Sequence, residues 1–180
     1  MTDSESTVET RAGLVALVGF PNVGKSSLMN RLVEQKLSIV TPFAQTTRER
    51  VLGIDSRDGV QMVFVDTPGL VDPRYLLHRA MMHIALDVIG DSDVVLLLID
   101  ASAGVPEFGE DVMELLDRAP KLLLVSNKMD VASAEKRDRV RAWSRERWKR
   151  RGHRVFWAKG RGTHAIRISA HSSVDPEDYS

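Results

Sequence analysis

The feature that most restricts this chain is residues 19–26, which read GFPNVGKS. They follow an apolar run at 14–18 and lead directly into a helix-like stretch at 25–33. The spacing G-x-x-x-x-G-K-S between a strand and a helix is that of a phosphate-binding loop. Its glycines let backbone N–H groups converge on phosphate oxygens, and the helix start adds the positive end of its dipole. A glycine-rich turn with a surface lysine is the alternative, but the flanking strand and helix favour the phosphate-binding loop.

Two side chains of this loop have specific expected roles. Lys25 is expected to reach the β- and γ-phosphates of a nucleotide, and Ser26 is expected to bind Mg²⁺. The predicted nucleotide-binding residues of the loop and of the helix start are Gly19, Phe20, Pro21, Asn22, Val23, Gly24, Lys25, Ser26 and Ser27.

Apolar runs that alternate with helix-like stretches predict the fold around this loop. Strands that are apolar on both faces and alternate with helices are typical of a mostly parallel sheet covered on both sides. The pair Asp58-Gly59 is a turn signal that joins two of the strands into a hairpin. The sequence therefore predicts an α/β fold with a mostly parallel six-stranded sheet and helices on both faces. The expected strands are 14–18, 51–55, 61–65, 94–99, 122–125 and one before Ala158, and the expected helices are 25–33, 75–89, 108–118 and 134–148.

The composition argues against several other classes of protein. The formal net charge is zero, which argues against binding nucleic acid or anionic lipid over the whole surface. The absence of cysteine excludes disulfides and thiolate metal sites and is compatible with a cytoplasmic location. The longest apolar run, residues 94–99, is too short to span a bilayer. Residues 1–10 are polar and acidic, and we expect them to form a disordered tail.

A second motif, DTPG, follows the predicted strand at 61–65. Asp66 is placed to hold Mg²⁺ through water, and Gly69 can offer its amide to a γ-phosphate. DTPG alone is a common turn, so its weight comes from its combination with the phosphate-binding loop. The residues of this motif that we predict to bind nucleotide are Asp66, Thr67, Pro68 and Gly69.

A third motif, NKMD, follows the predicted strand at 122–125. Asp130 can accept hydrogen bonds from N1–H and from the N2 amino group of guanine, a donor pair that adenine lacks. A site built on hydrogen bonds to its substrate can discriminate by about 10⁴-fold. We expect Asn127 to contact the other edge of the base and the stem of Lys128 to lie along the ring. The motifs together predict a site for GTP rather than ATP.

The polar stretch 38–54 lies between the first helix and the next strand, where a nucleotide-sensing switch would be expected. Thr47 is the predicted Mg²⁺ ligand there, and Thr46 is the second candidate. A solvated loop threonine is the alternative. The predicted metal ligands are therefore Ser26, Thr47 and Asp66.

These motifs and their surroundings resemble the Era family of bacterial GTPases from about Leu14 to Asp130. The stretch AQTTRERVLGI favours Era over related GTPases. The resemblance implies a Ras-like P-loop domain that hydrolyses GTP as a molecular switch, followed in the family by a KH domain that binds 16S ribosomal RNA during small-subunit assembly. The stretches that carry the resemblance are GFPNVGKSSLMNRLVEQKLSIVTPFAQTTRERVLGI, FVDTPGL, LHRAMM, DVVLLLIDA and VSNKMD.

The resemblance also implies the catalytic machinery. Asn22 matches a potassium ligand of the wider group, and Leu70 lies where Ras-type enzymes have a water-positioning glutamine. Leucine cannot orient water by hydrogen bonding, so slow intrinsic turnover is expected. The expected catalytic residues are Lys25, Asn22, Thr47 and Gly69. The expected cofactors are GTP or GDP, Mg²⁺ and K⁺.

The chain departs from the family towards its C-terminus. The final DPEDYS resembles the linker to the KH domain, so we expect KH-type RNA recognition to be missing. We divide the chain into the tail 1–10, a GTPase core 11–142 and a divergent segment 143–180. Residues 141–167 contain ten Lys or Arg residues, one acidic residue and all three tryptophans. They are either a basic, aromatic surface for RNA or an altered terminal segment.

The fifth nucleotide loop of the family is expected in this divergent segment. Ala158 and Lys159 have nearly the right spacing, although Trp157 stands where serine is expected. Ser169 and Ala170 match the expected residue types but lie too far along the chain. We therefore predict Ala158 and Lys159 as nucleotide-binding residues.

We interpret the sequence as that of a cytoplasmic GTPase that acts in small-subunit assembly, with a guanine nucleotide and ribosomal RNA as partners. Peripheral membrane association is a further expectation. One alternative is a nucleotide-binding or interaction module without productive turnover. Another is a GTPase of the same group that acts in tRNA modification or large-subunit assembly, which AQTTRERVLGI argues against.

Overall fold

The computed structural model describes residues 10–35, 50–70, 76–148 and 154–157. Strands and helices alternate along much of these ranges. The strands are β1 (Arg11–Val18), β2 (Val51–Arg57), β3 (Val60–Asp66), β4 (Val94–Asp100), β5 (Leu122–Asn127) and β6 (Arg154–Trp157). The helices are α1 (Lys25–Leu32), α2 (Leu76–Asp91), α3 (Glu110–Arg118) and α4 (Ala134–Trp148).

The strands form one sheet in the order β2-β3-β1-β4-β5-β6. Every neighbouring pair is parallel except β2 and β3, which form an antiparallel hairpin. The hairpin turn contains Asp58 at φ 51° and Gly59 at φ 75°, the two positive values that a tight hairpin turn favours. The predicted mostly parallel six-stranded sheet is therefore confirmed.

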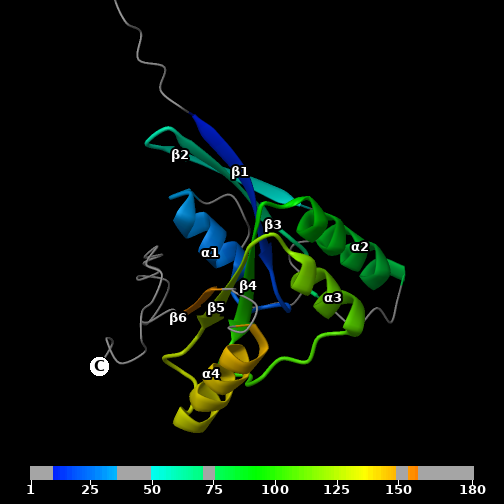
Figure 1. Cartoon of the computed structure of the whole chain (residues 1–180), viewed down its shortest axis with the longest axis vertical. Helices are drawn as coiled ribbons and strands as arrows, with labels where there is room; N and C mark the ends of the chain where they lie inside the picture. The colour runs from blue at the N-terminus through cyan, green and yellow to red at the C-terminus, as the bar shows by residue number, and fades with distance from the viewer. Residues whose placement is uncertain (1–9, 36–49, 71–75, 149–153, 158–180) are drawn as a thin grey trace, which may run out of the picture.

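Helices cover both faces of the sheet, as the apolar strands require. Helix α1 packs Leu28 and Met29 against one face, in a cluster with residues of β1, β3, β4 and β5. Helices α2, α3 and α4 pack Ile89, Leu116 and Val140 into a second cluster against the other face. Figure 1 shows α1 on one side of the sheet and α2 and α3 on the opposite side. The central strands are thus shielded from water on both faces.

One predicted helix start is wrong. Helix α3 begins at Glu110 rather than at Phe108. Phe108 instead stacks on Phe20 of the loop after β1, with ring centroids 4.8 Å apart. Gly109, at φ −62° and ψ 158°, is the extended N-cap that separates this stacked ring from the helix.

Helix α4 crosses the predicted boundary between residues 142 and 143, and β6 lies beyond it. The division into tail, core and divergent segment stays a prediction. No helix in the described ranges is both long enough and apolar enough to cross a bilayer. The predicted site residues that lie outside the described residues are Thr46, Thr47, Ala158, Lys159, Ser169 and Ala170.

Candidate functional site

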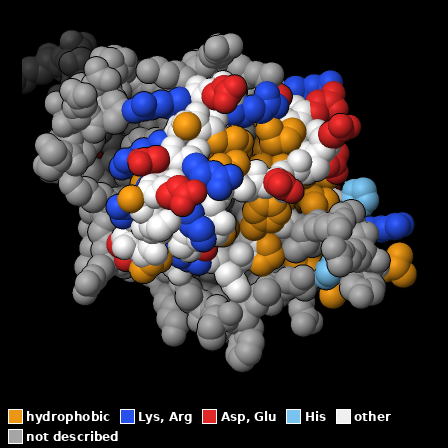
Figure 2. All heavy atoms as spheres, turned by 90° about the horizontal axis from the view of Figure 1, so that it is seen from below, with side chains coloured by type: hydrophobic (Ala, Val, Ile, Leu, Met, Phe, Trp, Pro, Cys, Tyr) orange, Lys and Arg blue, Asp and Glu red, His pale blue; other side chains and the backbone are white. Residues whose placement is uncertain are grey.

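The predicted motifs lie at one end of the sheet. Because β1, β3, β4 and β5 run parallel, the loops that follow Val18, Asp66, Asp100 and Asn127 leave the sheet at the same edge. Figure 2 views the molecule from below Figure 1, the end toward which β1 runs. On this end, side chains of both charges are interspersed around hydrophobic ones. The described residues there do not form a surface of one charge.

The loop after β1 has a backbone that requires glycine at two positions. Gly19 has a φ of 150° and Gly24 a φ of 104°, values that side-chain-bearing residues rarely adopt. A Cβ on Gly19 would lie 2.3 Å from the carbonyl oxygen of Leu98. A Cβ on Gly24 would lie 2.5 Å from Nδ2 of Asn127. The two glycines therefore let β4 and the NKMD loop approach the phosphate-binding loop closely.

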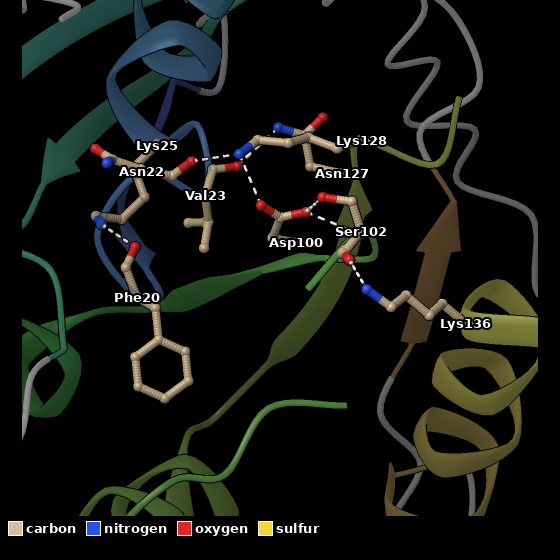
Figure 3. Close-up of polar contacts among 9 residues, drawn as sticks. All are labelled: Phe20, Asn22, Val23, Lys25, Asp100, Ser102, Asn127, Lys128 and Lys136. Carbon is tan, nitrogen blue, oxygen red and sulfur yellow. Dashed lines mark hydrogen bonds and ion pairs between the residues drawn. The ribbon is translucent and has the colours of Figure 1, made fainter. Parts of the chain in front are cut away.

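Lys25, the first residue of α1, is held inside this loop. It is 6% exposed, and its Nζ donates to the carbonyl oxygen of Gly19 at 3.0 Å. The same Nζ donates to the carbonyl oxygen of Phe20, also at 3.0 Å (Figure 3). Burial lowers the pKa of Lys25 to about 8, although the nearby carboxylate of Asp66 opposes this shift. The ammonium is thus still mostly protonated at neutral pH and lies where the loop backbone converges.

Ser26 and Asp66 meet although they come from different motifs. Oγ of Ser26 donates to Oδ2 of Asp66 at 2.6 Å, and Asp66 is fully buried at the end of β3. Mg²⁺ prefers hard oxygen ligands and is usually bound by one or two protein side chains together with phosphate oxygens. This hydroxyl–carboxylate pair therefore fits a magnesium ion. Within the described ranges, no group of three or more His, Cys, Asp or Glu side chains could hold a metal ion.

The DTPG motif packs directly on the phosphate-binding loop. Oγ1 of Thr67 donates to the carbonyl oxygen of Leu17 in β1 at 2.8 Å. A Cβ on Gly69 would lie 2.7 Å from the backbone nitrogen of Pro21. Any larger residue in place of Gly69 would thus push the two motifs apart.

Leu70 belongs to the hydrophobic core. Its side chain is 1% exposed and lies in the same cluster as Val18 and Val65. Its backbone nitrogen donates to the carbonyl oxygen of Gly19 at 3.0 Å. The position that matches the water-positioning glutamine of Ras-type enzymes is therefore occupied here by a buried apolar side chain.

Replacing Leu70 by glutamine should destabilise the fold without raising turnover. An amide buried without hydrogen-bond partners costs roughly 1–3 kcal/mol. Thermal unfolding should show a lower Tm for Leu70→Gln, whereas Leu77→Gln, a change at an exposed leucine of α2, should leave the Tm unchanged. Phosphate release from GTP should not exceed that of the wild type. A faster Leu70→Gln variant would contradict a purely apolar role for this position.

The NKMD motif is joined to the phosphate-binding loop by two side-chain hydrogen bonds (Figure 3). Nδ2 of Asn127 donates to the carbonyl oxygen of Val23 at 2.8 Å. Nζ of Lys128 donates to the carbonyl oxygen of Asn22, also at 2.8 Å. Asp130 follows in the same loop and is exposed. The motif is therefore fixed to the phosphate-binding loop, while the carboxylate of Asp130 is exposed and accessible to a nucleotide base.

The motifs did not reveal Asp100, the last residue of β4. Its Oδ2 accepts a hydrogen bond from Nζ of Lys128 at 2.7 Å, and its Oδ1 accepts from the backbone nitrogen of Ser102 at 2.9 Å. Burial alone would raise the pKa of Asp100, but the hydrogen bonds from Lys128 and Ser102 outweigh it and lower this pKa. The sequence signal that could have identified Asp100 is the apolar run VVLLLID, which ends on this carboxylate at the same sheet edge as the motifs.

The structure brings the three motifs together at one edge, whereas the fifth loop stays a prediction. Strand β6 ends at Trp157, which pairs with Ser126 of β5. The choice between Ala158–Lys159 and Ser169–Ala170 falls on residues outside the described ones. The predicted site residues that the structure places near this edge are Gly19, Phe20, Pro21, Asn22, Val23, Gly24, Lys25, Ser26, Ser27, Asp66, Thr67, Pro68, Gly69, Asn127, Lys128 and Asp130.

Sequence comparisons show which known proteins this chain is similar to. A family model described as 50S ribosome-binding GTPase matches residues 14–128. GTPase Era of Mesorhizobium japonicum is 47% identical over 133 residues, which cover 72% of this chain and 43% of that protein. GTPase Era of Fusobacterium nucleatum is 42% identical over 131 residues, which cover 71% of this chain and 44% of that protein. The chain thus spans less than half the length of these relatives.

Two solved structures of Era share the fold. Era of Aquifex aeolicus bound to GDP·AlF4⁻ superposes with a TM-score of 0.66 at 33% identity, over 81% of this chain and 50% of that one. Era in complex with MgGDPNP and nucleotides 1506–1542 of 16S ribosomal RNA superposes with a TM-score of 0.67 at 33% identity, over 82% of this chain and 51% of that one. Both neighbours were solved with a guanine nucleotide.

Proposed function

Because this chain belongs to the 50S ribosome-binding GTPase family, we propose that it binds GTP with Mg²⁺ and hydrolyses it to GDP and phosphate as a molecular switch. The observation that carries this proposal is the pair of hydrogen bonds from Asn127 and Lys128 to the phosphate-binding loop. Correct orientation of a nucleotide requires that its base and its phosphates be held at a fixed separation. These bonds set that separation, and the relatives named GTPase Era favour guanine as the base.

In this proposal each motif holds one part of the nucleotide. Lys25 binds the β- and γ-phosphates, and the backbone amide of Gly69 contacts the γ-phosphate. Ser26 and Asp66 hold Mg²⁺, which when bound neutralises charge on the phosphates. Asp130 accepts two hydrogen bonds from guanine. Thr47 remains the proposed further Mg²⁺ ligand.

We also propose that potassium supports hydrolysis at Asn22. The buried side chain of Leu70 cannot orient a water molecule by hydrogen bonding, so in this proposal hydrolysis depends on other groups that stabilise the charge of the transition state. Lys25 and backbone amides supply part of it. A monovalent cation near Asn22 would add positive charge beside the phosphates. The backbone carbonyl oxygen of Asn22 already accepts a hydrogen bond from Lys128.

We extend the proposal to a ribosomal partner in the cytoplasm. One Era neighbour is bound to nucleotides 1506–1542 of 16S ribosomal RNA, which makes small-subunit RNA the specific candidate. Filter binding to that RNA at several salt concentrations tests it, because phosphate contacts make affinity fall steeply with salt. No binding at low salt would limit this chain to the nucleotide switch.

Phosphate release by the 180-residue chain tests the proposed activity. We expect slow release with GTP, Mg²⁺ and K⁺, no release with ATP, and loss of release when EDTA removes Mg²⁺. Exchange of K⁺ for Na⁺ should slow the reaction. GDP and GTP binding without phosphate release would favour a binding module without turnover. Equal rates with ATP and GTP would overturn the proposal.

A further inference from the structure

Asp100 and Lys128 form an ion pair that connects the end of β4 to the phosphate-binding loop (Figure 3). Nζ of Lys128 donates to Oδ2 of Asp100 at 2.7 Å and to the carbonyl oxygen of Asn22 at 2.8 Å. The side chain of Asp100 is 17% exposed and that of Lys128 36%. A partly shielded ion pair of this kind is less weakened by solvent than a surface pair. One ammonium group therefore attaches the loop to the sheet.

The other carboxylate oxygen of Asp100 is fixed as well. Its Oδ1 accepts hydrogen bonds from the backbone nitrogen of Ser102 at 2.9 Å and from Oγ of Ser102 at 2.5 Å. The carbonyl oxygen of Ser102 in turn accepts from Nζ of Lys136 in α4 at 2.6 Å. Both oxygens of Asp100 thus have partners that fix the orientation of the carboxylate.

The contact of Lys128 with Asn22 lies in the left-handed part of the phosphate-binding loop. The φ of Asn22 is 61°, a value that asparagine adopts more readily than most other residues with a side chain. A lysine ammonium on a flexible four-carbon stem does not by itself keep one position. The charged hydrogen bond to Asp100 gives the ammonium a second attachment and directs it at the carbonyl of Asn22.

We propose that Asp100 is a positioning residue of the nucleotide site, which holds Lys128 against Asn22 and thereby keeps the phosphate-binding loop in its binding conformation. Its effect on nucleotide affinity rests on the proposed function, whereas its effect on the loop does not. The competing explanation is that Asp100 only stabilises the turn at Ser102, which would leave the loop unaffected.

Amide hydrogen exchange of the nucleotide-free chain tests the effect on the loop. Asp100→Asn keeps an oxygen for the amide of Ser102 but removes the charge that faces Lys128, so the amides of residues 22–25 should exchange faster. Asp117→Asn is the matched control, because Asp117 and Arg147 form an ion pair with side chains 19% and 31% exposed between α3 and α4. Unchanged loop exchange in Asp100→Asn, or equal acceleration in Asp117→Asn, would overturn the proposal.

GDP affinity tests the link to function. Loss of one charge-assisted hydrogen bond should weaken GDP binding by Asp100→Asn about tenfold. If Asp100 acts through Lys128, the double variant Asp100→Asn/Lys128→Ala should bind GDP no more weakly than Lys128→Ala alone. Additive losses would show that Asp100 acts by another route and would overturn the proposal. If the wild-type chain binds no GDP, the proposed function fails, and the exchange experiment still decides the role of Asp100.

Discussion

Replacing Lys25 by alanine should lower GDP and GTP affinity by at least about 100-fold and abolish measurable phosphate release. Hydrogen bonds to charged groups are worth roughly 1.5–3 kcal/mol each, and the ammonium, which has three N–H donors, can make two with the phosphates once one of its bonds to a backbone carbonyl is released. Each 1.4 kcal/mol is about a factor of ten in affinity. The same ammonium also donates to the carbonyls of Gly19 and Phe20, so its loss loosens the loop that receives the phosphates. Titration calorimetry with GDP measures the effect.

The control for Lys25→Ala is Lys121→Ala, which removes an exposed lysine just before β5 and should leave GDP affinity unchanged. Circular dichroism must show that both variants keep the fold. If a folded Lys25→Ala variant still binds GDP with wild-type affinity, the loop after β1 is not the phosphate site.

The backbone of the loop after β1 and of the β2–β3 turn was predictable from the sequence because each depends on a few adjacent residues. Gly19 and Gly24 adopt positive φ values that glycine tolerates, and they flank the turn that the spacing G-x-x-x-x-G-K-S predicts. Asp58-Gly59 likewise forms the predicted hairpin turn. Such local conformations depend on a few adjacent residues, so a short stretch of sequence is enough to specify them.

Asp100 was not predictable in this way because its role depends on the pairing of strands. Strand β4 lies beside β5 in a register that sets Asp100 opposite Asn127, and this brings Lys128 within 2.7 Å of the carboxylate. Nothing adjacent to Asp100 in the sequence encodes that neighbour. Phe108 was misassigned for the same reason, since its stacking partner Phe20 comes from the loop after another strand.

The composition of the segment after residue 142 did not determine its structure or the role of its basic residues. Helix α4 continues through it to Trp148, and β6 adds a four-residue strand beside β5. A run of basic residues fits a solvated helix face as well as a nucleic-acid surface, because both expose cations. In α4, Arg147 pairs with Asp117 and Arg141 with Asp138, so part of the positive charge is balanced within the domain.

Replacing Asp130 by asparagine should change the base that the site accepts. The carboxylate of Asp130 can accept both hydrogen bonds that guanine donates through N1–H and the N2 amino group. An asparagine amide has one acceptor and one donor group, which matches xanthine, where a carbonyl oxygen takes the place of the amino group. GTP affinity should fall by up to about 10⁴-fold in Asp130→Asn, because the N2 amino group would then face another donor. XTP affinity should rise at the same time.

Competition between GTP and XTP for a fluorescent nucleotide measures this exchange of specificity. Asp91→Asn, at an exposed position at the end of α2, is the matched control and should keep the preference for GTP. The wild type should also bind ITP more weakly than GTP, because hypoxanthine lacks the N2 amino group and leaves one lone pair of Asp130 unmatched. A simple loss of all binding in Asp130→Asn would point to damage of the loop rather than to base recognition. Gain of XTP binding excludes that explanation, since a disordered loop cannot acquire a new preference. If instead Asp130→Asn retains GTP at wild-type affinity, another residue selects the base, and the NKMD loop serves the site only through the bonds of Asn127 and Lys128 to the phosphate-binding loop.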